Sequence, residues 1–461
     1  MSYPENHQLS DGSRVAVIGG GPAGSFFAYF LLDMAERINL DLQVDIYEPR
    51  DFKIPGPPGC NMCGGVISET LVQNLASEGV RLPANIVQRG IDSYRLHTNV
   101  GNVTITAPNA ERRIAAIFRG SGPRDNQNTS WGSFDGYLLS AAQRKGARHK
   151  RVRVDEVRFV DGFPEISGRG SEAQRYDLLV VAAGINTSLL KHLQGGPMDF
   201  KPPRAAKTYI REYYFGAETI QKYLGNTFHV FLLNIARLEF AAIVPKGDYA
   251  TVCLLGDRMD ADLIETFIAS PEVQACMPPG WEAGQISCQC SPRINVAKPS
   301  QLFGDRLVFI GDSGVTRLYK DGIGAAYRAA KAAAATAVFQ GVSAEDFRKH
   351  FWPACRGMEF DNQIGRVIFL ITSLIQRYPF AHQALLKMIA DEQVHHGYPL
   401  QMSTVMWDTF TGSAPYSDIF LRTLQPSFLY RFVRDLLVSL WLLIARREHM
   451  NKEGRPWNQE I

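Results

Sequence analysis

Residues 14–25 read RVAVIGGGPAGS, and this stretch decides the fold. A β-branched run leads directly into the pattern Gly19-x-Gly21-x-x-Gly24, and an apolar stretch with helical spacing follows at once. Gly19 permits a tight turn, Gly21 lets the backbone approach a pyrophosphate, and Gly24 lets the helix pack closely on the strand. The positive end of the helix dipole would then face the phosphates. The order of strand, turn and helix predicts a dinucleotide-binding unit.

An acidic residue stands where such a unit binds a ribose. The second predicted strand, VDIYE, ends in Glu48, 24 positions after Gly24. A carboxylate at this point accepts hydrogen bonds from sugar hydroxyls. We therefore expect Glu48 to bind the ribose of the nucleotide.

Two later segments are also predicted strands that lead into a glycine. One reads YDLLVVAAG and ends at Gly184, and the other reads DRLVFIGD and brings Gly311 and Asp312 to the end of a strand. Residues 322–324, Gly-Ile-Gly, then open an alanine-rich helix. An aspartate at a strand end binds sugar or ribityl hydroxyls, and a second helix start offers backbone donors to a phosphate or a ring carbonyl. These segments predict further contacts to the same nucleotide.

Composition limits the classes of protein that remain. The chain has 461 residues, of which 45% are hydrophobic and 21% charged, and its formal net charge is +3. These values describe a globular protein and do not favour nucleic acid as a partner, so small molecules are expected instead. The N-terminus lacks the features of a signal peptide, and seven irregularly spaced cysteines fit a reducing compartment. We expect a cytoplasmic protein.

Together these motifs resemble the FAD-binding set of flavoproteins with the hydroxybenzoate-hydroxylase type of fold. Within that superfamily, PGPPGCNMCGGVIS (residues 55–68), with Cys63 before two glycines, is similar to the geranylgeranyl reductase family. FRGSGPR and SFDGYLLSAAQRKGA, within residues 118–147, add to the likeness, which spans residues 14–345. The resemblance implies bound FAD, and Cys63 beside the flavin and the substrate. The cofactor-binding residues expected are Gly19, Gly21, Pro22, Ala23, Gly24, Glu48, Arg119, Gly184, Gly311, Asp312, Gly322, Ile323 and Gly324.

The departures from the superfamily pattern narrow the chemistry. The loop GDSGVTRLYKDGIG (residues 311–324) has neither the histidine nor the proline usual in the aromatic hydroxylases. The Trp-x-Trp-x-x-Ile pattern of flavin halogenases is absent from the sequence. The arginine expected before the FDxxLL segment is also missing. We expect Arg119 or Arg124 to make that flavin contact instead.

The resemblance and the pattern of elements predict an α/β fold. A Rossmann-like FAD-binding domain, discontinuous in sequence, is interleaved with a mixed β-sheet substrate domain and followed by a helical C-terminal region. The expected boundaries are residues 14–75, 130–200 and 300–345 for the first, 76–129 and 201–299 for the second, and 346–461 for the third. Strand character is found in KTYIREYYF, TFHVFLL, LEFAAIVP and YATVCLL, and a helix is expected at 260–270.

The predicted sheet is rich in aromatic residues. They would suit a long apolar substrate, although such stripes are also typical of a plain core. The residues concerned are Tyr209, Tyr213, Tyr214, Phe215, Phe228 and Phe231.

The electron donor has no motif of its own, because no second glycine-rich strand–turn–helix unit of the kind that forms a separate NAD(P)H domain follows the first. NAD(P)H bound transiently, a ferredoxin or a quinol would each serve. The basic stretch at residues 144–158 would receive an acidic carrier protein or a nucleotide phosphate, or it is a solvated surface.

Cysteines form two close pairs, Cys60 with Cys63 and Cys288 with Cys290. They would bind an iron–sulfur cluster or zinc, form redox disulfides, or be small buried thiols, and their spacing matches no standard cluster run. The remaining three are interpreted as core residues: Cys253, Cys276 and Cys355. No metal site is predicted.

The C-terminal region contains two unusually apolar segments, residues 367–375 and 428–447. The uninterrupted apolar run at 436–445 is too short to span a bilayer core of about 30 Å. One interpretation is a helix lying in the membrane interface on the inner face of the membrane. The other is a helix packed on its own domain or on a dimer partner. In the first, four arginines would lie at the headgroups: Arg431, Arg434, Arg446 and Arg447.

The sequence favours two candidate functions over a third. The first is an FAD-dependent oxidoreductase that transfers hydride to or from a carbon–carbon bond of a hydrophobic, isoprenoid-like substrate. Its candidate proton donors are Cys63, Tyr319 and Lys320, whose loops should face the ring. The second is a membrane-associated electron-transfer flavoprotein that reduces a quinone. The third is a flavin monooxygenase.

Overall fold

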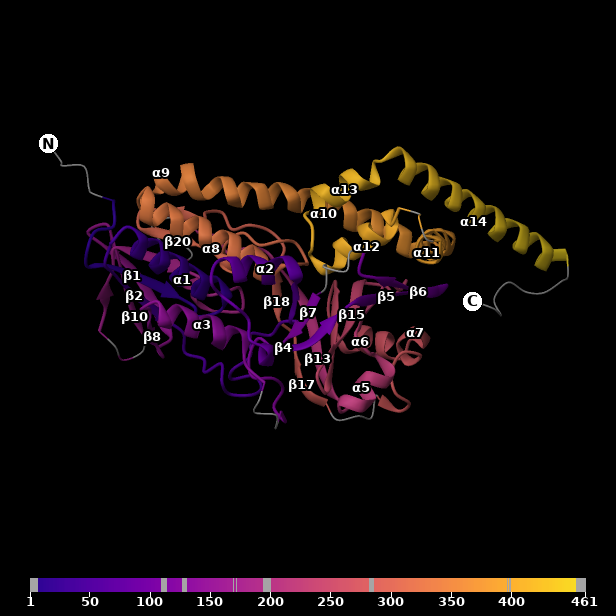
Figure 1. Ribbon diagram of the computed structural model, residues 1–461, viewed down its shortest axis with the longest axis horizontal. Coiled ribbons are helices and arrows are strands. Elements are labelled where there is room, and N and C mark those ends of the chain that lie inside the picture. The colour runs from indigo at the N-terminus through magenta and orange to yellow at the C-terminus, as the bar shows by residue number, and fades with distance from the viewer. Residues whose placement is uncertain are drawn as a thin grey trace.

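The computed structural model describes residues 7–108, 114–126, 131–168, 170, 172–193, 200–281, 286–395, 397 and 399–452. The molecule is elongated, with an α/β body that holds the N-terminal strands at one end and a second sheet toward the other (Figure 1). Long C-terminal helices run along one side of both.

The first sheet is the predicted Rossmann-like one. Its strand order is β19-β20-β12-β1-β2-β8, and all neighbours pair in parallel except β19 with β20. Both faces of its central strands are covered, which is why segments such as LLVV are uniformly apolar and buried. The strands are β1 (Ser13–Ile18), β2 (Leu42–Tyr47), β8 (Arg148–Lys150), β12 (Leu178–Val181), β19 (Phe303–Gly304) and β20 (Leu307–Phe309).

Helices cover one face of this sheet and a small sheet covers the other. The helices are α1 (Pro22–Arg37), α3 (Phe134–Arg144) and α8 (Gly322–Phe339). The covering sheet consists of β9 (Val154–Val160), β10 (Phe163–Gly168) and β11 (Gln174–Arg175). The alanine-rich sequence of α8 lets it pack closely against α1.

The second sheet is mixed. Its order is β17-β13-β16-β15-β14-β5-β6, with β18 beside β13, and only β14 and β5 pair in parallel among the described residues. Its strands are β5 (Ser93–Thr98), β6 (Gly101–Thr106), β13 (Ala205–Tyr214), β14 (Thr227–Phe231), β15 (Leu238–Lys246), β16 (Tyr249–Gly256), β17 (Ile286–Cys290) and β18 (Arg293–Asn295). The four predicted strand runs are confirmed, as is the helix, α6 (Ala261–Ile268).

Short elements connect the two sheets. A three-stranded sheet contains β3 (Val66–Ser68), β4 (Val87–Ile91) and β7 (Ile114–Ile117), with α2 (Glu69–Ser77) and η1 (Ala84–Ile86) between its strands. The other short helices are α4 (Leu189–His192), α5 (Ala217–Tyr223) and α7 (Pro271–Gln274).

The C-terminal region is helical, as predicted. It contains α9 (Ala344–Asp346), η4 (Phe347–Phe351), α10 (Trp352–Arg377), α11 (Pro379–Val394), α12 (Gln401–Thr411), α13 (Tyr416–Thr423) and α14 (Pro426–Lys452). Proline begins α11, and Gly412 ends α12 with a φ of 77°, so local sequence sets these boundaries. In the described part of the chain, none of the helices is both long and apolar enough to cross a membrane.

Candidate functional site

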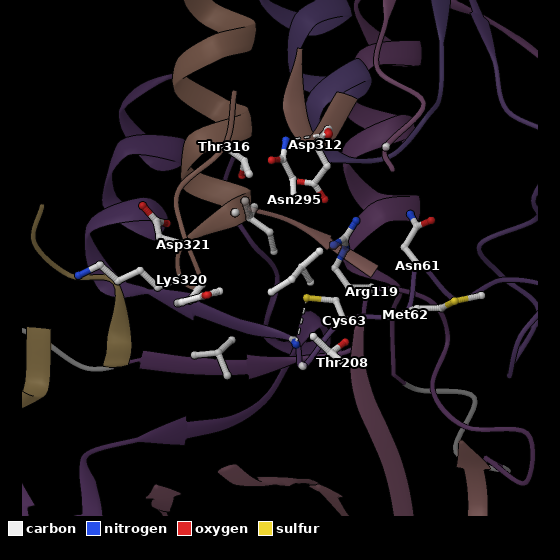
Figure 2. A pocket seen from close by; sticks show the side chains of 18 of the residues that line it. Asn61, Met62, Cys63, Arg119, Thr208, Asn295, Asp312, Thr316, Lys320 and Asp321 are labelled. Carbon is white, nitrogen blue, oxygen red and sulfur yellow. Dashed lines mark hydrogen bonds between the residues drawn. The ribbon is translucent and has the colours of Figure 1, made fainter. Parts of the chain in front are cut away.

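A cavity of about 380 Å³ lies where the carboxyl ends of β1, β2, β12 and β20 meet the second sheet. Figure 2 shows some of the side chains that line it. This edge of a parallel sheet is where α/β proteins bind ligands. Of the expected cofactor-binding residues, those that line the cavity are Gly19, Gly21, Pro22, Ala23, Glu48, Arg119, Gly184, Gly311, Asp312, Gly322 and Ile323.

The turn between β1 and α1 has the geometry that its glycines predict. Gly19 has a φ of 108°, and a Cβ there would lie 2.3 Å from the Ala182 carbonyl oxygen. Gly24 does not line the cavity, but a Cβ on it would lie 1.9 Å from the Gly19 oxygen. The helix therefore approaches the strand as closely as it does because both residues are glycine. Gly21 caps α1 without a side-chain hydrogen bond, which leaves the first-turn amides without a side-chain acceptor.

Glu48 closes the next strand end and is buried at the cavity wall. Its Oε2 accepts a hydrogen bond from the Gly20 amide at 3.0 Å, and its Oε1 accepts one from the Arg50 amide at 2.9 Å. These bonds fix the carboxylate beside the glycine-rich turn. Each oxygen keeps lone pairs for further donors.

Asp312 follows β20 and lines the cavity, to which its surface is open. Burial raises the pKa of this carboxyl, while the positive charge of Arg119 acts in the opposite direction. Asn295 holds the loop, because its amide donates to the carbonyl oxygens of Asp312, at 3.1 Å, and Gly314, at 2.9 Å. Gly311 has a φ of 62°, which allows the sharp turn before Asp312.

The start of α8 also faces the cavity, through Gly322 and Ile323. Asp321 caps the helix by accepting from the Gly324 amide at 3.2 Å. A Cβ on Gly324 would lie 2.1 Å from the Asp321 carboxylate, so Gly324 supports the cap and does not line the cavity.

Arg119 is the centre of a buried polar network on the cavity wall. It binds Asp135 with two nitrogens, at 2.5 and 2.8 Å. Asn61 donates to Asp135 and accepts from Arg50, which extends the network to the Glu48 side. Burial lowers the pKa of Arg119, but Asp135 and then Cys63 raise it by more, so the guanidinium is firmly charged.

The sequence suggests two arginines for the flavin contact, Arg119 and Arg124, and Arg119 is the one that lines the cavity. Arg124 does not line it, since its side chain packs near Gly56 and its amide donates to the Cys288 sulfur at 3.3 Å. The expectation for Arg124 is not supported by its position.

Cys63 lies on the cavity wall next to Arg119 (Figure 2). Its sulfur accepts from the Gly65 amide at 3.4 Å. The loop is constrained, because Met62 has a φ of 51° and Gly65 a φ of 70°. Behind it, a Cβ on Gly65 would lie 3.0 Å from the buried ammonium of Lys246, so the loop packs tightly against the second sheet. The local backbone aims the thiol into the cavity.

Tyr319 and Lys320 also line the cavity, but their polar atoms are already bonded. The Lys320 ammonium donates to the carbonyl oxygens of Asp408, at 2.8 Å, and Ala414, at 3.0 Å, and Figure 2 shows it turned toward the C-terminal helices. Burial lowers its pKa to about 7. The Tyr319 hydroxyl lies 3.5 Å from Glu239, and burial raises its pKa. Cys63, Tyr319 and Lys320 all remain predictions as proton donors.

The far part of the cavity is apolar. It lies between the second sheet and the C-terminal helices α10 and α12, and its lining comes from residues far apart in sequence. The apolar lining residues include Phe228, Phe240, Ala242, Val244, Leu255, Phe369 and Phe410.

Several predictions about side chains are corrected here. Of the six aromatic residues considered for the substrate, Tyr209 and Phe228 line the cavity, but Tyr209 packs with Tyr213 and Phe231 in a core on the opposite face of the sheet. Phe228 lies on the face of the sheet that meets the cavity. Tyr214 is exposed and Phe215 packs against that same core. Side chains alternate between the faces of a strand, so neighbouring aromatics separate.

The cysteines differ from expectation at one position. Cys253 is not a plain core residue, because it lines the cavity. Cys276 and Cys355 lie in core clusters as expected, and Cys276 also lies beside two histidines. All seven cysteines are free thiols. Within the described residues, neither close pair joins a further ligand to form a three-membered metal cluster.

No family model matches this chain, and no curated protein matches it. Solved structures share its fold. A geranylgeranyl bacteriochlorophyll reductase-like protein from Thermoplasma acidophilum has a TM-score of 0.63 at 16% identity, over 90% of this chain and 99% of that one. A flavoprotein/dehydrogenase from Cytophaga hutchinsonii has 0.62 at 13%, over 93% and 100%. The halogenase PltM, in complex with FAD, has 0.57 at 12%, over 97% and 93%.

These structures share the overall fold of the chain, which confirms the expected α/β fold class. The likeness covers nearly the whole length of each partner.

Sequence reasoning missed three polar residues of the site, Asn61, Asp135 and Asn295. Asn61 stands within the CNMC segment and Asp135 within the SFDG segment, so both were inside quoted motifs. Asn295 comes from β18, and no local pattern marks it. Only the fold brings it to Asp312.

Proposed function

We propose that this chain is an FAD-dependent oxidoreductase that transfers hydride to or from a carbon–carbon bond of a long apolar, isoprenoid-like molecule. One observation carries the proposal. A single cavity contains both the strand ends with the glycine-rich turn, Glu48 and Asp312 and the apolar part described above, which we call the apolar chamber. The Cys63 thiol lies on the wall of this cavity. A dinucleotide cofactor and a hydrophobic substrate could meet there.

The residues present fit FAD. The uncapped start of α1 and the cradle at Gly19 and Gly21 suit a pyrophosphate, and the fixed carboxylate of Glu48 suits a ribose. Asp312 would hold a ribityl hydroxyl, since it lines the cavity. The ring carbonyls would be met by the start of α8 and by Arg119. Bound FAD would supply hydride transfer at its N5.

The chain's own residues would supply the proton and exclude water. Reduction of an alkene needs a proton at the second carbon, and Cys63 is the cavity-lining acid with a neighbouring cation, Arg119. Arg119 would steady the thiolate left behind after the transfer. Phe240, Phe369 and Phe410 would cover the substrate and keep the chamber dry.

The helix α14 suggests how an apolar substrate would reach the cavity from a membrane. The burial pattern of this helix is the reverse of that of an ordinary surface helix. It buries Asp435 (1% exposed) and Ser439 (4%) while exposing Leu437 (62%) and Trp441 (66%). It packs along α11 and extends from the body (Figure 1). We infer that α14 lies in the membrane interface on the inner face of the membrane, with its exposed apolar side toward the lipid. The substrate would then enter from the bilayer.

The electron donor is proposed on chemistry alone, as NAD(P)H or a ferredoxin. The basic stretch 144–158 gives limited support to an acidic carrier, because several of its arginines already pair with acids. Arg148 binds Asp45 at 2.7 Å, and Arg153 lies 3.3 Å from Asp155.

The experiment compares wild type with Cys63→Ala and Cys63→Ser, with Cys355→Ala as a buried-thiol control. Flavin reduction by NADPH, NADH and reduced ferredoxin is measured separately from saturation of a polyprenyl alkene. We expect alkene reduction to fall at least 100-fold in both Cys63 variants, with flavin reduction unchanged. Equal alkene reduction in wild type and Cys63→Ala would reject the role of the thiol.

The burial pattern of α14 equally supports a second function, that of a membrane-bound electron-transfer flavoprotein that reduces a quinone. In that case no proton donor to carbon is needed. Quinone reduction unaffected by Cys63→Ala, with no alkene reduced by wild type, would favour this alternative. A third candidate, a flavin monooxygenase, predicts oxygen-dependent product formation.

A further inference from the structure

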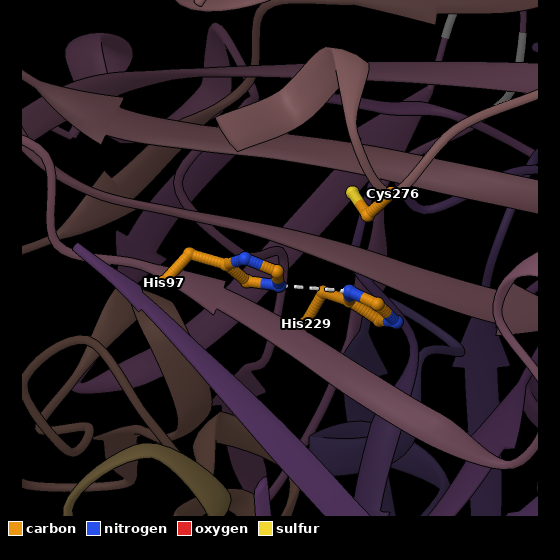
Figure 3. Close-up of side chains that lie close together, drawn as sticks. All are labelled: His97, His229 and Cys276. Atoms are coloured by element: carbon orange, nitrogen blue, oxygen red, sulfur yellow. Dashed lines mark hydrogen bonds between the residues drawn. The ribbon is translucent and has the colours of Figure 1, made fainter. Parts of the chain in front are cut away.

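Three metal-ligating side chains meet outside the cavity described above. They are His97 on β5, His229 on β14 and Cys276 directly after α7 (Figure 3). All three are buried, and one potential ligand atom from each lies within 4.8 Å of the other two. The chain thus brings two imidazoles and a thiol together from three separate elements.

The pairing register of β5 and β14 explains why the two histidines are neighbours. β5 and β14 are parallel neighbours in which His97 pairs with Phe231, so His229 is its diagonal neighbour on the same face. The His97 ring stacks on Phe231 with ring centres 4.5 Å apart. This face is opposite the one on which Phe228 lines the first cavity. The cluster is therefore separate from the proposed flavin site.

We propose that His97, His229 and Cys276 bind a zinc ion. Two imidazole nitrogens and one thiolate are a ligand set that zinc accepts in proteins. His97 Nε2 and His229 Nδ1 are 3.0 Å apart. Two nitrogens about 2.0–2.1 Å from a tetrahedral zinc are roughly 3.4 Å apart, so the rings must separate by a few tenths of an ångström and turn their nitrogens from each other toward the ion. The Cys276 side chain must close on the same point, since the three ligand atoms lie within 4.8 Å of one another.

Zinc binds the neutral imidazole of histidine and the thiolate of cysteine, so protons move when the ion enters. One proton lies between the two facing nitrogens, and on zinc binding it moves to the other nitrogen of its ring. Cys276 loses its thiol proton to solvent as the sulfur–zinc bond forms, and its hydrogen bond to the Val273 oxygen is broken.

A second cavity gives access to the cluster. It measures about 330 Å³ and is lined by His97 and Cys276 among others. Glu272 lines it too, and its Oε2 is buried with no hydrogen-bond partner among the described residues, while Oε1 accepts from Asn99 at 3.2 Å. The fourth zinc position would face this cavity, where water or Glu272 would fill it. The ion would tie α7 to the sheet and stabilise the second domain.

The test uses the untagged full-length protein, stripped with a chelator and then titrated with zinc alone. The site variants are His97→Gln and Cys276→Ser. The matched controls are His382→Gln and Cys355→Ser, which change a buried histidine and a buried cysteine elsewhere. Bound zinc is measured by mass spectrometry of the metal after dialysis, and folding by circular dichroism.

We expect one zinc per chain in wild type and both controls, and at least tenfold weaker binding in both site variants. No zinc bound by wild type, or unchanged binding in the site variants, would overturn the proposal. X-ray absorption at the zinc edge of the wild-type protein gives an answer that does not depend on how the variants fold. It should show one sulfur and two imidazole ligands, whereas two or more sulfurs would place the ion among the other cysteines and reject the site.

Discussion

Arg119 holds the carboxylate of Asp135 with two nitrogens, at 2.5 and 2.8 Å, next to the Cys63 thiol. Asp135 is fully buried and Arg119 nearly so. This pair fixes the Arg119 guanidinium on the wall of the cavity. The local charge at the proposed reaction centre therefore depends on Asp135, which itself does not line the cavity.

Replacing Asp135 by Asn should uncouple this pair. Breaking a buried ion pair leaves an uncompensated charge, so we expect a loss of about 3 kcal/mol in the free energy of unfolding and weaker FAD binding. Asp391→Asn, which breaks the exposed pair with Lys387, should cost less than about 0.5 kcal/mol. Chemical denaturation and the flavin-to-protein absorbance ratio measure both effects. Equal stability of the two variants would contradict the assigned role.

Lys320 should give the protein a distinctive dependence on pH. Burial lowers its pKa in the folded protein from 10.5 to about 7, so between these values the unfolded chain binds more protons than the folded one. Stability then rises with pH across this interval, by up to about 1.4 kcal/mol per pH unit from this group. Below about pH 7 the cost of burying the charge is fully present.

The measurement is urea denaturation of wild type and Lys320→Met at pH 7 to 10. The difference in stability between them should change with pH over this range, because Met cannot titrate. Parallel curves for the two proteins would show that the Lys320 pKa is not lowered.

Ala242 tests the apolar chamber. It lies on β15, beside Phe228 and Phe240 on the cavity wall, and a phenyl ring there would fill the space. Ala242→Phe should lower kcat/KM at least tenfold for a C20 polyprenyl alkene and leave a C5 alkene nearly unaffected. Ala242→Ser, which adds little volume, is the control, and FAD content should be equal in all three proteins. An equal effect on short and long substrates would place the substrate elsewhere.

The exposed side of α14 tests the proposed membrane contact. Leu437→Glu with Trp441→Glu should reduce binding to vesicles of anionic phospholipid at least tenfold, because both side chains would have to leave the acyl region. Phe339→Glu, an equivalent change of an exposed residue on α8, should leave binding unchanged. Co-sedimentation measures the bound fraction. If the double variant instead converts a dimer to a monomer in scattering experiments, α14 is a protein interface.

The part of the cavity at the strand ends was predictable because its residues belong to short local motifs. Gly19, Gly21, Glu48 and Asp312 each follow a strand, and parallel strands bring their carboxyl ends to one edge. The same logic predicted the two helix starts at the cavity.

The apolar part of the cavity was less predictable, because it forms only when elements far apart in the sequence pack together. Phe369 and Phe410 reach the cavity from helices more than 100 residues after β14 and β15, and no spacing in the sequence announces this. His97 and His229 meet through the pairing of β5 with β14, which are separated by over 120 residues. The direction of the Lys320 side chain also depends on packing, since its partners are backbone oxygens of α12 and of the segment after it.

The most direct test of the central claim is a single-turnover experiment under anaerobic conditions. The purified protein is loaded with FAD, reduced with a stoichiometric amount of dithionite, and mixed with a polyprenyl alkene or with a quinone while flavin absorbance is followed. We predict stoichiometric FAD, reoxidation by the alkene, and one saturated carbon–carbon bond per flavin by mass spectrometry. A protein that binds no FAD, or one reoxidised by the quinone alone, would contradict the account.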